Sequence, residues 1–243
     1  MTNASRPQKT ALLVAQRIVR DIERNGLGPG DKLPPERLMM ETYDAGRGTL
    51  RESLRFLELQ GVLSLKPGPG GGPVIEKPTA DNLATTLTLL LQFDGARYRV
   101  IAEARAAFEP LMAHLAAERI TPDQRQELEQ TLVKMADGIE DLEVYLETNR
   151  RFHNIIAWAS GNALFGHLVE VMVGGMEISG ANQGVQYPLR RRQAVLHAHQ
   201  EIYDAIRAAT ADQAEKAMRA HIDEYLTYAS RKYPEALDKL IRW

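Results

Sequence analysis

Cysteine is absent from this chain of 243 residues, which excludes disulfide bonds, thiolate zinc sites and cysteine nucleophiles. Long apolar runs are missing too. No stretch approaches the ~18 residues that a membrane span requires, and the first residues lack the apolar core of a signal peptide. The net charge is only -2, so the overall charge favours no class of binding partner. We therefore expect a cytoplasmic protein without a membrane partner.

Charge is divided unevenly along the chain, which indicates two domains. Residues 1–78 contain 12 Lys and Arg against 9 Asp and Glu, whereas residues 79–243 contain 18 against 23. A mildly basic segment joined to an acidic one is typical of a DNA-binding domain attached to a domain with another task, because phosphate contacts supply much of the affinity for DNA. Pro78 and the polar residues after it mark the boundary, so we expect domains at 1–78 and 79–243.

The first domain is predicted to contain three helices followed by a hairpin. Apolar residues recur at helical spacing over residues 10–25, two prolines open a second helix that ends near Tyr43, and a third helix extends from about Arg47 to Gly61. Two short strands, 62–65 and 73–75, are predicted around the glycine-rich tract 66–72. This tract lacks the Gly-Lys-Ser/Thr ending of a phosphate-binding loop. The order of elements instead indicates a winged helix-turn-helix, which binds DNA.

The third helix is predicted to bury one face and to expose arginines on the other. At about 100° per residue, Arg51 and Arg55 lie opposite the apolar face, and Arg47 lies at the N-terminal tip, where recognition helices touch base edges. Arginine suits this position because its planar fork binds guanine or phosphate with two hydrogen bonds. A solvated helix face is the alternative for these arginines considered alone. The predicted apolar face consists of Leu50, Ser53, Leu54 and Leu57.

Residues 30–38, 47–58 and 61–63 resemble the N-terminal domain of GntR-family bacterial transcription regulators. The first of these segments is Gly-Asp-Lys-Leu-Pro-Pro-Glu-Arg-Leu, and the second begins Arg-Gly-Thr-Leu-Arg-Glu. Gly46 and Gly48 depart from the commonest pattern, in which Ser or Thr often flanks the first arginine. Because those hydroxyls can bind phosphate, we expect the affinity and base preference to differ from those of relatives. The resemblance implies DNA contacts from Arg37, Arg47, Thr49 and Arg51, with the wing contributing near Gly68.

The second domain is predicted to be an all-helical bundle, because apolar residues recur at a helical spacing through most of it. The segments around Arg105, Asn149, His199 and His221 resemble the FCD effector-binding domain of the FadR-like subfamily. We therefore expect a mainly α protein, with an N-terminal winged helix-turn-helix and a C-terminal FCD-type bundle. The predicted helices of the bundle are 83–91, 100–119, 122–135, 142–159, 164–173, 190–209 and 211–228.

Three histidines of the second domain are candidates for a metal site. Asn149 and His153 are four residues apart and share a helix face, while His199 and His221 fall on two later helices. Neutral imidazole suits a divalent cation such as Zn or Ni, and the resemblance implies that these four residues bind it. Asn149 stands where the metal-binding members carry aspartate. Because an amide oxygen is neutral, we expect a weakened site. We interpret the remaining candidates as structural or exposed: His114, His167 and His197.

Arginines near these histidines are candidates for binding an effector. The resemblance implies that the helix of Arg105 faces the effector cavity, so Arg105 would contact an effector carboxylate or support a residue that does. The alternative for Arg105 is an ion pair with Glu109, four residues later on the same helix. The run Arg190-Arg191-Arg192 would guide an anionic ligand toward the cavity, but a solvated run of charges is the favoured interpretation of this segment.

These observations predict a homodimeric, ligand-responsive transcription repressor. Two DNA-binding domains would bind the halves of an inverted-repeat operator, and a small carboxylate or an acyl thioester would shift the dimer to a geometry that no longer spans them. An acyl-coenzyme A-responsive regulator without metal is one alternative. A metal-dependent enzyme on a helical bundle is disfavoured, because the sequence contains no Glu-x-x-His pair of the di-iron type. An architectural DNA-binding protein would leave the helical domain without a task.

Overall fold

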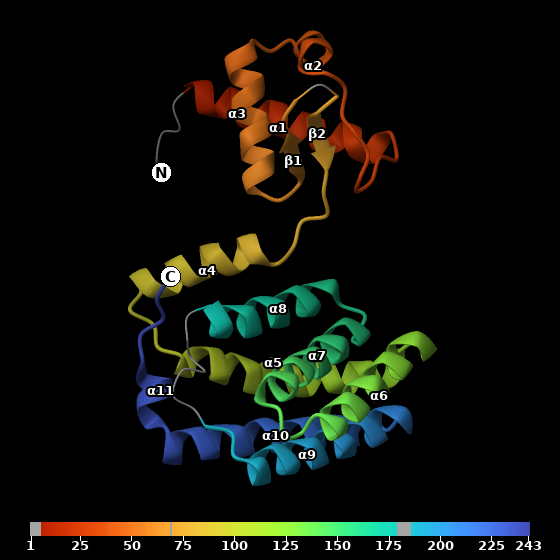
Figure 1. Cartoon of the computed structure of the whole chain (residues 1–243), viewed down its shortest axis with the longest axis vertical. Coiled ribbons are helices and arrows are strands. Elements are labelled where there is room, and N and C mark those ends of the chain that lie inside the picture. Colours follow the sequence, from red (N-terminus) through yellow and green to blue (C-terminus); the bar gives the residue numbers. More distant parts are fainter. Residues whose placement is uncertain (1–5, 69, 179–185) are drawn as a thin grey trace. The chain divides into compact units, whose positions relative to one another are not determined.

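The computed structural model describes residues 6–68, 70–178 and 186–243. Contacts between Cα atoms divide the chain into two compact units, residues 1–82 and 83–243, each with its own core (Figure 1). In the described part of the chain, no helix is both long and apolar enough to span a bilayer.

The first unit is a winged helix-turn-helix, as the order of its elements predicted. Its core is formed by residues such as Ile18, Met39, Leu50 and Leu54, each at most 1% exposed. β1 and β2 form an antiparallel hairpin in which Leu63 pairs with Ile75 and Lys66 with Gly72. The elements are α1 (Arg6–Arg24), α2 (Glu36–Tyr43), α3 (Arg47–Leu59), β1 (Leu63–Lys66) and β2 (Gly72–Ile75).

The free edge of β2 is covered by the segment just before α2, a contact that the sequence did not predict. An isolated antiparallel bridge joins Lys32 to Val74. Around it, the backbone N–H of Leu33 donates to the carbonyl of Pro73 over 2.9 Å, and the N–H of Ile75 donates to the carbonyl of Asp31 over 2.9 Å. Only a few residues pair, and they follow a Gly-Pro-Gly turn, so no alternating apolar pattern marks them in the sequence.

The second unit is an all-helical bundle in which α5 packs against α7, α8, α9 and α10 (Figure 1). Large side chains fill its core, among them Met112, Phe152, Ile202 and Met218. α4 begins at the end of the first unit and continues into the second. The helices are α4 (Asp81–Phe93), α5 (Arg99–Arg119), α6 (Pro122–Asp137), α7 (Leu142–Ala159), α8 (Ala163–Ile178), α9 (Leu189–Arg207), α10 (Ala211–Lys232) and α11 (Pro234–Asp238).

The C-terminal end differs from the sequence-based expectation. α10 continues four residues beyond Tyr228, to Lys232, and Pro234 then opens α11, a short helix that was not predicted. The chain after α11 returns to the start of the bundle, where the backbone N–H of Ile241 donates to the carbonyl of Ala96 over 3.0 Å. This long-range pairing ends the unit, and a helical periodicity pattern carries no signal for it.

Candidate functional site

Helix α3 has the two faces that its periodicity predicted. Leu50, Ser53, Leu54 and Leu57 are buried. The Ser53 hydroxyl is fully buried and lies 2.8 Å from the carbonyl oxygens of both Ala11 and Thr49, so it ties α3 to α1. The opposite face is therefore the one that faces solvent, and it is held on a packed scaffold.

The predicted DNA-contacting arginines are exposed and paired only weakly. Arg51 lies 3.4 Å from the Glu36 carboxylate, and Arg37 lies 3.3 Å from that of Glu41. Exposed ion pairs of this kind are worth about 0–1 kcal/mol, so a phosphate can replace the carboxylate at little cost. Arg47 is exposed at the first position of α3, with no acidic partner among the residues that the structure describes. Thr49 is half-buried beside it.

The N-terminus of α3 is open. Gly46 is its N-cap in extended conformation and supplies no side-chain hydrogen bond, so the first N–H groups of the helix are available to an anion. A Cβ atom added at Gly46 or Gly48 would meet nothing within 4 Å, and neither residue has a positive φ. No packing requirement of this unit therefore explains these two glycines.

The wing tip depends on glycine. Gly68 has φ 91°, and its carbonyl accepts a hydrogen bond from the N–H of Gly71 over 3.0 Å. At Gly71 a Cβ atom would lie 2.2 Å from the carbonyl oxygen of Lys66, so only glycine fits there. The Lys32 ammonium donates to the carbonyl of Gly70 over 2.8 Å and fastens the tip to the segment before α2.

Three buried imidazoles meet inside the second unit. His153 from α7, His199 from α9 and His221 from α10 are at most 7% exposed, and each offers a ring nitrogen within 4.8 Å of the other two. The ring centroids are 4.8–5.3 Å apart. Phe152 stacks on His199 at 3.9 Å and fixes the plane of that ring. The structure thus brings together the three histidines that were predicted to share a site.

A buried carboxylate orients one of these rings. Glu109 on α5 is 2% exposed, and one of its oxygens lies 2.5 Å from Nδ1 of His153, while the other pairs with Arg105. With the proton on Nδ1 directed to this carboxylate, Nε2 of His153 carries the lone pair. Nε2 of His153 and both ring nitrogens of His199 are buried without a hydrogen-bond partner among the described residues. A divalent cation would satisfy such nitrogens, so the residues present fit a metal ion.

The charge states of the cluster also suit a metal. Burial and the neighbouring His221 and His153 hold the pKa of His199 well below its ordinary value, and burial together with His153 lowers the pKa of His221 to about 3. Burial opposes ionisation of Glu109, but Arg105 and His153 outweigh it and hold the pKa of that carboxyl below its ordinary range. Both histidines are therefore neutral at pH 7 and would not have to release a proton to bind a metal.

A cavity of about 70 Å³ adjoins the cluster. At about 10–15 Å³ per water position it holds roughly five to seven water-sized groups. Asn149 is half-buried and lines it with His153 and His221. Three arginines also line it and no acidic residue does, among the described residues of its wall. The other polar groups of the wall are Arg105, Arg150, Arg191, Tyr145, Tyr187 and Tyr225.

Arg105 combines the two alternatives that the sequence left open. It forms the ion pair with Glu109, and it also lines the cavity. The ion pair with Glu109 was predicted from the spacing of four residues, but the contact of Glu109 with His153 was not.

The interpretation of 190–192 as a solvated run of charges is wrong for two of its three arginines. Only Arg190 is exposed. Arg191 is 7% exposed and lines the cavity. Arg192 donates to the backbone carbonyls of Tyr187, Ile139 and Glu140 and so ties the start of α9 to the connection between α6 and α7. Arg191, Val195 and His199 share one helix face at a spacing of four, which was the available signal.

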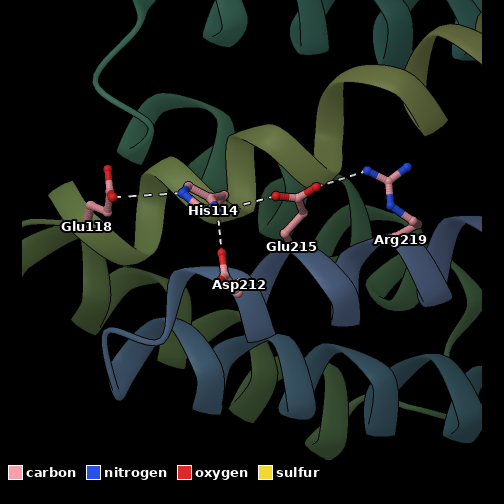
Figure 2. A network of polar contacts seen from close by, with 5 residues as sticks. All are labelled: His114, Glu118, Asp212, Glu215 and Arg219. Carbon is pink, nitrogen blue, oxygen red and sulfur yellow. Dashed lines mark hydrogen bonds and ion pairs between the residues drawn. The ribbon is translucent and has the colours of Figure 1, made fainter.

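The remaining histidines lie elsewhere. Figure 2 shows His114 between Glu118 on its own helix and two carboxylates of α10, with Nδ1 at 3.3 Å from Glu215 and 3.6 Å from Asp212. His114 is not among the described residues that line the cavity. His197 is exposed, and His167 packs edge-on against Trp158. These positions agree with the interpretation of all three as structural or exposed.

Comparisons with known proteins match both units. The family model described as "Bacterial regulatory proteins, gntR family" matches residues 10–71, and the FCD domain model matches residues 100–224. The chain is 30% identical over 226 residues to the uncharacterised HTH-type transcriptional regulator YcbG of Bacillus subtilis, covering 93% of this chain and 91% of that protein. It is 26% identical over 219 residues to the HTH-type transcriptional repressor NanR of Edwardsiella tarda, covering 89% and 84%.

Two further similarities span most of the chain. An Escherichia coli K12 protein, provisionally assigned as the regulator of an L-lactate dehydrogenase operon, is 32% identical over 227 residues, covering 89% of this chain and 84% of that protein. The solved structure titled "Streptococcus agalactiae GntR" superposes with a TM-score of 0.74 at 30% identity and covers 90% of this chain and all of that one.

Proposed function

Because this chain belongs to the GntR family of bacterial regulatory proteins and carries an FCD domain, it is a DNA-binding, ligand-responsive transcription regulator, and we propose that it is a repressor released from its operator by a small carboxylate. One observation carries the second part. A cavity with cationic walls adjoins three buried imidazoles whose ring nitrogens include three without a partner among the described residues. The relatives reported above are regulators of transcription rather than enzymes, which disfavours the enzymatic alternative.

The proposed DNA surface consists of α3, the start of α2 and the wing. Arg47 and Arg51 would contact base edges or phosphates, Arg37 and Thr49 would contact the backbone, and the wing would approach DNA near Gly68. The exposure of the three arginines and the weakness of their ion pairs support this assignment. A homodimer would place two such surfaces on the halves of an inverted repeat.

The proposed metal is Zn or Ni, held by His153, His199 and His221, with Asn149 at the fourth position. Such an ion polarises a bound carboxylate oxygen and so helps to hold an effector. Glu109 fixes the ring of His153, and Arg105 in turn fixes Glu109, which makes Arg105 a supporting residue rather than the effector's direct partner. Because Asn149 contributes no charge, we expect the metal to bind more weakly than at a site that carries aspartate there.

The size of the cavity favours a small effector over an acyl thioester. Room for roughly five to seven water-sized groups suits a hydroxy or oxo acid with two or three carbon atoms, whereas coenzyme A alone is many times larger. Three arginines on the described wall favour an anion. The effector can act only by binding more tightly to the dimer geometry that does not fit the operator.

The test has two arms. Metal is measured by inductively coupled plasma mass spectrometry in purified wild type and in His199→Ala, with the exposed His197→Ala as the matched control. We expect near-stoichiometric metal in wild type and His197→Ala, and loss in His199→Ala. In the second arm, an operator selected from random DNA is bound by the metal-loaded protein, and glycolate and L-lactate are added. Binding that neither acid weakens would contradict the proposed class of effector.

A further inference from the structure

Arg191 is the only one of the three arginines in its run that lies on the wall of the cavity, and it is held there on two sides. Its side chain is 6% exposed and comes from the first turn of α9. One terminal nitrogen pairs with Glu224 of α10, and the guanidinium lies 4.4 Å from the centroid of the Tyr228 ring. Its Nε is buried without an acceptor among the described residues. A buried charged donor left unpaired is costly, so this group is suited to receive an oxygen.

The two partners of this ion pair differ in their surroundings. The side chain of Glu224 is 56% exposed, so its carboxylate can turn into water at little cost. The guanidinium of Arg191 cannot, because it is enclosed. The buried guanidinium requires an anionic partner, so a carboxylate that enters the cavity can replace the carboxylate of Glu224.

Arg105 offers a contrast within the same cavity. Its carboxylate partner, Glu109, is 2% exposed and also bonds His153, so neither partner of that pair can turn away without leaving a buried charge. Of these two arginine pairs, the one with Glu224 is the pair that a ligand can exchange.

We infer that Arg191 is the anion receptor of the effector cavity and that Glu224 is the protein's own carboxylate with which the effector competes for it. This inference rests on the proposed function, because it names the partner of the effector's carboxylate. Binding then replaces an ion pair between α9 and α10 with one between α9 and the ligand. Occupancy of the cavity is thereby converted into a loosened contact between two helices that also carry His199 and His221.

The test uses acetate, the smallest probe that shares the carboxylate of any effector of the proposed class. Zinc-loaded, 15N-labelled full-length protein is titrated with sodium acetate at constant ionic strength, and the Nε–H signal of Arg191 is followed by NMR. The signal is assigned by its loss in Arg191→Lys. We expect the signal to shift saturably, and the midpoint acetate concentration to fall about fivefold in Glu224→Gln. In Arg191→Lys, where this signal is absent, the midpoint is measured on the signals of Tyr145 and Tyr225 and should rise at least tenfold.

Two control variants remove the same charges from adjacent exposed positions. Arg190→Gln and Asp223→Asn should leave the midpoint within twofold of wild type, since both side chains are exposed and neither belongs to the ion pair between Arg191 and Glu224. If Asp223→Asn lowers the midpoint as much as Glu224→Gln does, general electrostatics accounts for the effect and the competition is disproved. Should Arg191→Lys fail to fold, Glu224→Gln still decides, because it alters an exposed side chain.

The remaining outcomes separate this inference from the proposed function. A saturable response at Tyr145 and Tyr225 with an unmoved Arg191 signal would overturn the role of Arg191 and leave the small carboxylate in place. The absence of a saturable response at every residue of the cavity would overturn the small carboxylate, and the receptor role with it, while binding to the operator would be unaffected.

Discussion

Arginine has opposite surroundings in the two units. On α2 and α3 the arginines are exposed, and the carboxylate partners of Arg37 and Arg51 are exposed as well, so DNA can easily break these pairs. Around the cavity, Arg105 and Arg191 are enclosed and each is held by a glutamate. An exposed arginine is available to a macromolecule, whereas the position of each buried one is fixed by a particular glutamate of the protein. The comparison supports the proposal that the exposed arginines bind the polyanion DNA and that the enclosed ones bind a small anion.

The largest expected effect concerns the exposed arginines of α3. Arg47→Ala and Arg51→Ala should each weaken binding to the selected operator by about 1–3 kcal/mol, roughly five- to 150-fold, because a bidentate contact is lost. Fluorescence anisotropy over a range of salt concentrations checks this. Arg20→Ala, which removes the same charge from the exposed side of α1, is the matched control. Operator binding that falls equally in all three variants would mean that α3 is not the recognition helix.

Glu109→Gln, a change among the buried residues beside the cavity, is expected to have a comparable effect. Loss of the carboxylate that orients His153 should weaken zinc binding about 10–100-fold, as measured by competition with a chelator. Glu215→Gln is the control, since it removes a carboxylate that pairs with His114, a histidine outside the three-histidine cluster (Figure 2). Thermal unfolding of the apo proteins separates a metal effect from a loss of fold, because Arg105 is left without its partner. An unchanged zinc affinity in folded Glu109→Gln would show that the carboxylate does not orient the ligand.

A smaller change in the same site is expected from Asn149→Asp. A carboxylate compensates the charge of the ion where an amide does not, so zinc affinity should rise on the order of tenfold. Calorimetry on wild type and variant measures the difference. Equal affinities would place Asn149 outside the coordination sphere. Asn162→Asp, at an exposed position outside the described cavity wall, is the control, because aspartate can accept the same hydrogen bond from the N–H of Leu164.

The smallest effect is expected at the N-terminus of α3. Gly46→Ser should supply the missing N-cap and a phosphate-binding hydroxyl, which together are worth a few tenths of a kcal/mol in stability and about a two- to fivefold gain in operator affinity. Thermal unfolding and anisotropy measure the two gains. The site is open to a Cβ atom, so no steric cost offsets them. A weaker operator complex with an unchanged melting temperature would indicate that the DNA itself occupies this space.

The exposed arginines of α3 were easier to predict from the sequence than the buried residues around the cavity. The buried face of α3 follows from periodicity, and with it the outward direction of Arg51, because a helix has a fixed repeat. The convergence of His153, His199 and His221 came from a family resemblance, since a single sequence contains no information on which distant helices meet. The contact of Glu109 with His153 was not predicted, and Arg191 was misjudged, for the same reason. Their environment depends on packing between helices, and a charged residue looks alike in the sequence whether it is solvated or enclosed.

The bridge between Lys32 and Val74 has a mechanical consequence for the first unit. The segment before α2 is tied to β2 by backbone hydrogen bonds and to the wing tip by the Lys32 ammonium. A displacement of the tip is therefore expected to pass through these bonds to the beginning of α2, where Arg37 lies. If the wing and the start of α2 both contact DNA, as proposed, we expect the two contacts to depend on each other.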